Sequence, residues 1–196
     1  MSSEIKANSI QDKTGTRVLA SDSGSAWSWG SGVPADTIIQ VKQTIKTDTT
    51  NHYNSNSSIS WNDISGMSVN ITPATGNKIL VSVSLMVGSS PQYLNNVKIV
   101  KGSGGSFSDF AVGDSAGVRP RSTFGYRGEI DVTMFNLSGL FLDESPGGDG
   151  STQLTYKLQW TGEQSGTMYL NRMNSSTDGY YHGRYASTIT VMEVKG

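Results

Sequence analysis

Apolar and polar residues alternate with a period of two along much of the chain. In the segment 154–160, four apolar residues at every second position alternate with Thr, Lys and Gln. The segment 78–87 has the same pattern, with one face formed by Ile79, Val81, Val83, Leu85 and Val87 and with Ser82 and Ser84 on the other. Successive side chains of a strand point to opposite faces of its sheet, so both segments predict strands that bury one face.

Shorter signals of the same kind recur from Thr37 onward. They predict strands over 38–45, 64–71, 78–87, 97–100, 121–126, 134–142, 154–160, 168–170 and 188–194. In the first of these, Ile39, Val41 and Ile45 share a face. Turn formers separate the strands, and no stretch has a helical period. Nine or ten short strands of this kind predict an all-β fold, an antiparallel two-sheet sandwich of the jelly-roll type.

The first 36 residues have a different texture. They are polar, with a Ser- and Gly-rich segment at 21–34 that carries Trp27 and Trp29. An isolated hairpin of this composition is marginal in water and needs a partner surface. We therefore expect two parts, an N-terminal attachment arm at 1–36 and a β-sandwich body at 37–196.

Composition supports this division and excludes several functions. Hydrophobic residues make up 35% of the chain, and 23 glycines supply turn conformations. With a net charge of −1 and no basic stripe, we expect no nucleic-acid binding. The absence of cysteine excludes disulfides and thiolate metal sites. Neither a signal peptide nor a run of 18 apolar residues is present, so we expect no membrane insertion and no export by a signal peptide, and release on a virus particle fits both observations.

Three stretches carry a family resemblance. They are IKANSIQD at 5–12 with GSAWSWG at 24–30, WNDISGMSVNITP at 61–73 with NKILV at 77–81, and STITVMEV at 187–194. Together they resemble the small tail-fibre and virion-appendage proteins of marine phages, especially those that infect cyanobacteria. The resemblance spans nearly the whole chain, although 88–150 is less distinctive.

The resemblance implies a virion protein with an attachment segment and a trimeric knob similar to tumour-necrosis-factor and complement globular domains. Members of the family include tail fibres, head fibres and decoration proteins. No catalytic residue and no cofactor comes with the resemblance, so we expect a non-enzymatic protein.

The residues that could carry chemistry are few. His52 and His182 have no partners at metal-binding or catalytic spacing in the sequence. A loop that holds Asp143, Glu144 and Asp149 could supply paired carboxylates for glycoside hydrolysis, or oxygen ligands for calcium. A solvated turn explains the same residues, so we assign no catalytic, metal or cofactor site.

Aromatic residues give the remaining candidates. For docking on another virion protein of tail, connector or capsid, the arm offers Ile5, Ile10, Val18, Trp27 and Trp29. A loop before the last strand combines tyrosine and arginine, which are enriched in binding hot spots, as Arg172, Tyr180, Tyr181, Arg184 and Tyr185. This loop is predicted to contact either a host-surface glycan or protein, or a neighbouring subunit.

The sequence thus favours a homotrimeric tail fibre or appendage that recognises a host surface. A capsid-decorating or head-fibre protein, a free lectin-like module and a small polysaccharide hydrolase remain alternatives. An arm bound to capsid, glycan binding without the arm, or release of reducing sugar would distinguish them.

Overall fold

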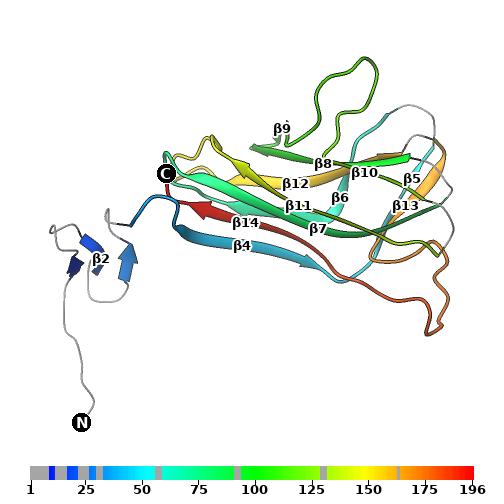
Figure 1. Cartoon of the computed structure of the whole chain (residues 1–196), viewed down its shortest axis with the longest axis horizontal. Coiled ribbons are helices and arrows are strands. Elements are labelled where there is room, and N and C mark those ends of the chain that lie inside the picture. Colours follow the sequence, from blue (N-terminus) through cyan, green and yellow to red (C-terminus); the bar gives the residue numbers. More distant parts are fainter. Residues whose placement is uncertain are drawn as a thin grey trace, which may run out of the picture.

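The computed structural model describes the chain as two parts, a small sheet near the N-terminus and a larger sandwich (Figure 1). It describes residues 33–55, 59–90, 94–128, 132–162 and 164–196, together with the backbone of 9–11, 17–21 and 27–29. All regular elements in these ranges are strands. Among the described residues there is no helix that could cross a membrane.

The strands follow one another in this order: β1 Ser9–Gln11, β2 Arg17–Ser21, β3 Trp27–Trp29, β4 Ile38–Lys46, β5 Thr50–Asn54, β6 Asn62–Ile71, β7 Lys78–Ser90, β8 Leu94–Ser103, β9 Ser106–Phe110, β10 Phe124–Arg127, β11 Phe135–Asp143, β12 Leu154–Gly162, β13 Gly166–Leu170 and β14 Ser187–Val194.

The pairing of the body strands is nested. β4 pairs with β14, β6 with β12, β7 with β11, and β8 with both β9 and β10, all antiparallel. Additional pairings of β14 with β7 and of β12 with β8 assemble two sheets. One contains β4, β14, β7 and β11, and β13 and β5 extend it at the end of β7; the other is ordered β6-β12-β8, with β9 and β10 both paired with β8. This is the connectivity of a jelly roll, in which a long hairpin is wound over itself. The predicted all-β, jelly-roll sandwich is confirmed.

The core lies between the inner faces of these sheets. The alternating residues of β7 predicted to share a face are all buried, and the apolar residues of β12 face them. Trp160 and Tyr156 are the largest fully buried side chains. Burial of one aliphatic side chain such as those of β7 contributes about 1.5–3 kcal/mol to the free energy of folding. The core therefore supplies the main stabilising contribution.

The hairpin between β8 and β9 depends on two glycines. Ser103 pairs with Ser106, which leaves Gly104 and Gly105 as a two-residue loop with φ of 57° and 88°. Both values are positive, as in a type I′ hairpin turn, and glycine adopts positive φ without steric cost. The sequence predicted a strand over 97–100, and β8 is longer at both ends, from Leu94 to Ser103.

β4 has its polar side toward the body. Thr44 Oγ1 donates to the carbonyl of Ser68 at 2.6 Å, and Lys46 is buried beside Gly66, so this side of β4 covers the edge of β6. Val41 and Ile45 therefore point outward, while Ile39 lies where the register with β14 shifts. The apolar face of β4 that the sequence predicted exists, but it is the outer one.

Several strands were not predicted. β5 (TNHYN) and β9 (SFSDF) are short, polar edge strands without a clear alternation of apolar residues. In the arm, β1, β2 and β3 form a three-stranded antiparallel sheet rather than a single hairpin. Body contacts begin shortly before residue 37, because Val33 is buried and the amide of Asp36 donates to the carbonyl of Lys195 at 2.8 Å.

Asn171 fastens the segment that leads from β13 to β14. Its side-chain amide donates to the carbonyls of Lys46 (2.8 Å) and Asp48 (2.9 Å), and its Oδ1 accepts from Ser187 Oγ (2.6 Å). Asn171 is completely buried and has a φ of 62°, a conformation that asparagine tolerates better than most residues. One side chain thus connects the ends of β4, β13 and β14.

We expect Asn171→Ala to lower the free energy of unfolding by about 2–4 kcal/mol, because it leaves buried partners without their hydrogen bonds. Urea unfolding at fixed protein concentration measures the loss. Asn70→Ala, at an exposed asparagine of β6 outside this network, is the matched control and should change stability by less than about 0.5 kcal/mol. Equal effects of the two substitutions would show that the buried network contributes little.

Candidate functional site

The outer face of the sheet β4-β14-β7-β11 carries no charge over most of its length. Its outward positions in 41–45, 80–86, 136–142 and 188–192 hold only apolar, hydroxyl and amide side chains. Lys78, paired with Asp36 at 3.4 Å, lies beyond one end of this area. We call these outward positions the neutral face.

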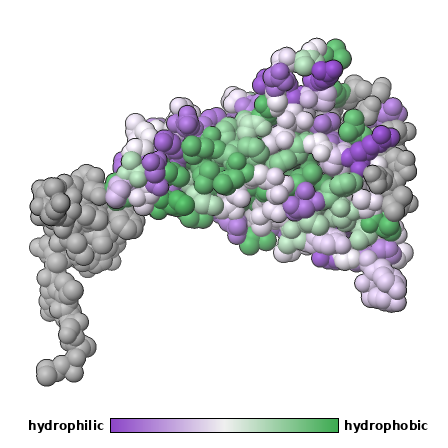
Figure 2. Space-filling view, in the orientation of Figure 1, coloured by the Kyte–Doolittle hydropathy of each residue, from purple (hydrophilic) through white to green (hydrophobic). Residues whose placement is uncertain are grey.

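Apolar residues form a continuous row across the neutral face. Direct strand pairing aligns four of them from edge to edge, as Val41, Met192, Leu80 and Leu142. Leu140 lies in the next row and Ile45 in the one after it. The exposed fractions of Val41, Ile45, Leu140 and Leu142 are 56%, 59%, 60% and 45%. Hydrophobic residues gather over the part of the body where Figure 1 places β7, β11 and β14 (Figure 2).

The outer face of the opposite sheet is built differently. Lys157 pairs with Asp63 at 2.7 Å and Lys98 pairs with Asp109 at 2.6 Å. Each lysine also lies over an aromatic ring, Phe107 for Lys157 and Trp61 for Lys98. Charged side chains keep a sheet face hydrated, and the same fold thus has one hydrated outer face and one neutral face.

The loop 171–186 separates its predicted contact residues into two groups. Arg172 and Tyr185 lie at the base, where the Arg172 guanidinium stacks on Tyr169 at 4.1 Å and the Tyr185 amide donates to the carbonyl of Asn171 at 3.2 Å. Arg184 is exposed. The second group, Tyr180 and Tyr181, is at the tip. All five residues lie between β13 and β14, as the sequence predicted.

Tyr180 and Tyr181 form the tip of this loop. They occupy the centre of a turn closed by a hydrogen bond of 2.9 Å from the His182 amide to the Gly179 carbonyl. Their ring centroids are 4.1 Å apart, and the Tyr180 hydroxyl donates to the Tyr181 hydroxyl at 2.8 Å, which raises the pKa of Tyr180. The exposed fractions are 90% and 75%, so both rings stand in solvent.

The predicted docking residues of the arm belong to the small sheet or to the part of the chain outside the described residues. Ile5 lies outside them. Ile10 is in β1, Val18 in β2, and Trp27 and Trp29 in β3. In the ladder, Leu19 stands opposite Ile10 on one side and opposite Trp29 on the other, so three apolar residues occupy one row of this sheet.

Asp143 and Asp149 of the predicted acidic loop are held by different partners. Asp143 is buried, and its Oδ2 accepts hydrogen bonds from Lys101 Nζ (2.6 Å) and the Tyr156 hydroxyl (2.7 Å). Burial, together with the adjacent Asp143 carboxylate, raises the pKa of Tyr156 far above its ordinary value. Asp149 accepts instead from Thr152 and Ser151, and the Thr152 bonds hold its pKa well below the usual range.

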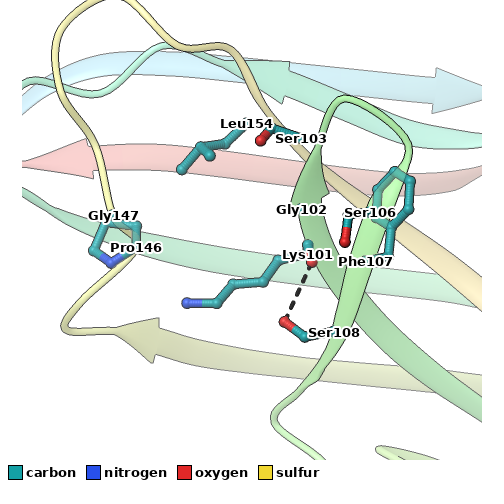
Figure 3. Close-up of a pocket in the computed structure, with 9 residues that line it drawn as sticks. All are labelled: Lys101, Gly102, Ser103, Ser106, Phe107, Ser108, Pro146, Gly147 and Leu154. Atoms are coloured by element: carbon teal, nitrogen blue, oxygen red, sulfur yellow. Dashed lines mark hydrogen bonds between the residues drawn. The ribbon is translucent and has the colours of Figure 1, made fainter.

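A cavity of about 380 Å³ lies beside Lys101, between the β8–β9 hairpin and the β11–β12 loop (Figure 3). Its walls include Phe107, Pro146, Leu154 and three serines. The Lys101 ammonium is already neutralised by Asp143, so the cavity offers no free charge from this side chain. Within the described ranges, no group of three or more His, Cys, Asp or Glu residues could hold a metal ion.

The two histidines have different surroundings. His52, in β5, stacks on Trp160 with ring centroids 6.3 Å apart, and burial lowers its pKa. His182 is held at the loop tip by Thr177 Oγ1, 2.7 Å from its Nδ1. Neither contact is with a second acid or base.

The sequence analysis did not identify the neutral face. Its residues come from four strands, and alternation within a single strand does not say which side faces the core. A signal existed in β4, where Val41 and Ile45 share a side with Gln43 while Gln40, Lys42 and Thr44 share the other, but the second, more polar side is the inner one. A second signal lay in β11. Leu140 and Leu142 alternate there with Gly139 and Phe141, so apolar residues occur on both sides of the strand and one of these sides must face outward.

Comparisons with known proteins do not assign a function to this chain. No family model matches the chain, and neither does any curated protein. The chain is distantly similar to a protein in the solved structure of infectious bursal disease virus Gx strain, at 11% identity and a TM-score of 0.39. The match covers 96% of this chain and 49% of that one, so the chain spans about half the length of that protein. A match this distant carries no argument about function.

The Lys101–Asp143 pair generates a stability prediction. Lys101→Met leaves a buried carboxylate, with an exposed fraction of 6%, without its cation, and we expect a loss of about 3 kcal/mol in the free energy of unfolding. Lys157→Met is the matched control, because Lys157 also has one ion pair and one ring contact, but its partner Asp63 is 54% exposed. Its expected loss is below about 1 kcal/mol, and urea unfolding of both variants tests the difference.

Proposed function

We propose that this protein is a structural component of a phage virion, a homotrimeric appendage with an attachment arm and a β-sandwich knob for host-surface recognition. The neutral face carries the proposal. The jelly-roll body and the resemblance of the sequence to virion-appendage proteins agree with it. The role is adhesive and mechanical, and no catalytic step is required.

The size of the neutral face supports its use between subunits. Four strands spaced about 4.8 Å apart, over about eight residues of 3.3 Å each, give an area on the order of 500 Å². This is comparable with the largest patch that a typical monomer exposes, and more than half of one subunit's share of a standard interface. The absence of charge favours burial, since a charge in the interface would lose its hydration.

A second copy of the chain is the partner that we propose for this face. The row Val41–Met192–Leu80–Leu142 runs from edge to edge of the sheet, so a neighbouring subunit can bury it without charged groups that need compensation. Three copies assembled around these faces would point their arms in one direction. Weak contacts of each knob with a host surface would then add through avidity.

The arm is proposed to fix the knob to another virion protein. Its sheet has only three short strands, in which Leu19 pairs with Ile10 on one side and with Trp29 on the other, and so small a sheet is expected to need a partner surface. A tail, connector or capsid protein would supply the missing surface. The alternative of a capsid-decorating or head-fibre protein differs only in which of these partners the arm binds.

Charge on the neutral face tests the trimer. We expect the full chain to have the mass of a trimer by light scattering at micromolar concentration, and Val41→Glu to be monomeric, because three copies would bury unpaired carboxylates. Ser68→Glu places the same charge on the outer face of β6 and should remain trimeric. A monomeric full chain would overturn the trimeric knob, and a trimeric Val41→Glu would place the interface elsewhere.

Removal of residues 1–32 tests the arm. The shortened chain should still form trimers, because the described body begins at Val33, but it should be missing from purified particles. Immunoblotting of particles assembled with the full and the shortened chain measures incorporation. Equal incorporation would contradict attachment through the arm, and absence of both chains from particles would favour a free lectin-like module.

A further inference from the structure

We infer that the turn Gly179–His182 is a carbohydrate-binding tip, on which the rings of Tyr180 and Tyr181 stack against the C–H face of a pyranose. This inference rests on the proposed function and names the class of host ligand. The basis is the exposure of Tyr180 and Tyr181, which the fold of the described residues does not require.

The tip lies at the end of the body opposite to the arm. β14 starts at Ser187, directly after the loop, and ends at Val194, beside the hydrogen bonds that join Lys195 to Asp36 and Thr37. Eight strand residues span about 26 Å, which separates the loop from the point where the arm joins. The two regions lie at opposite ends of the body in Figure 1. A subunit fixed by its arm therefore presents this loop outward.

The turn contains residues that local structure does not explain. The central positions of a turn favour Gly, Pro, Asn, Asp and Ser, which stabilise the turn conformation. Here both central residues are tyrosines, and their rings contact each other rather than the body. An aromatic ring stabilises the fold only when it is buried, and these two rings are exposed. A role in binding therefore explains them better than a role in folding.

The tip is also held in place. The hydroxyl–hydroxyl bond joins the two rings, Thr177 Oγ1 fixes His182, and the base is anchored by Asn171. Tyrosine has two χ angles and so loses little entropy when it binds. The result is a pair of exposed rings whose planes meet at 37° and whose hydroxyls are joined by a hydrogen bond.

A sugar fits this surface better than a protein or a nucleic acid. Two tyrosines bury at most about 300–500 Å², which is well below the roughly 800 Å² per partner of a standard protein interface. Nucleobases also stack on tyrosine, but the net charge of −1 gives the chain no excess of cations to neutralise phosphates. A pyranose needs only an aromatic face for its C–H groups and polar groups for its hydroxyls, and the tip has both.

Saturation-transfer NMR on the full-length chain tests the inference, with the methyl glycosides of glucose, galactose, mannose and N-acetylglucosamine as probes. We expect transfer to the ring C–H protons of at least one glycoside. The double variant Tyr180→Ala/Tyr181→Ala should weaken binding at least tenfold, since truncation of stacked aromatic residues removes most of the contact. The double variant Tyr180→Phe/Tyr181→Phe keeps the ring faces and should retain most of the transfer.

Tyr53→Ala is the matched control, because Tyr53 is an exposed tyrosine of β5 outside this loop. It should leave transfer unchanged. The inference is overturned if the wild-type chain shows no transfer to these probes, if the double alanine variant binds as well as wild type, or if the phenylalanine variant loses as much as the alanine variant. An unchanged melting temperature shows that each variant is folded.

Light scattering on the same samples separates this inference from the proposed function. A monomer with tyrosine-dependent transfer would keep the glycan site and overturn the trimeric appendage. A trimer without transfer would keep the appendage and overturn the glycan site.

Discussion

Hydrogen bonding of β7 to strands on both of its edges is the constraint on which the rest of the structure depends. β14 and β13 pair with one edge of β7, and β11 pairs with the other. Its inward residues are fully or almost fully buried against the opposite sheet. Because a strand alternates strictly, fixing this inner face also fixes which residues of β7, β14 and β11 point outward. The neutral face is thus a direct consequence of how the core is built.

The two outer faces of the sandwich indicate different surroundings. Paired lysines and aspartates cover the sheet that contains β6 and β12, which is compatible with permanent exposure to water. The sheet that contains β4 and β14 has no such charges over its central rows and presents a continuous apolar row instead. A subunit that buries one face and exposes the other would need this distribution, and the trimer that we propose rests on it.

The body also has two different ends. The arm joins beside the C-terminus, where Asp36 and Thr37 bond to Lys195. The opposite end carries the loop with Tyr180 and Tyr181, anchored through the buried side chain of Asn171. The buried ion pair of Lys101 and Asp143, with Tyr156, lies between the sheets and has its bonds satisfied within the body. Those charged groups therefore serve the fold, while the uncharged surfaces remain available for partners.

The sequence by itself determined the class of fold and most of the strands, because a period of two and frequent turn formers follow from local geometry in 78–87 and 154–160. It also placed the aromatic loop before the last strand. Short polar strands such as β5 and β9 escaped, since their pairing depends on neighbours distant in the sequence. Only the tertiary structure decided that Val41 and Ile45 point away from the core and that Asp143 is bonded by Lys101 and Tyr156. Both outcomes depend on which strands lie side by side, and alternation within a single strand carries no information about its neighbours.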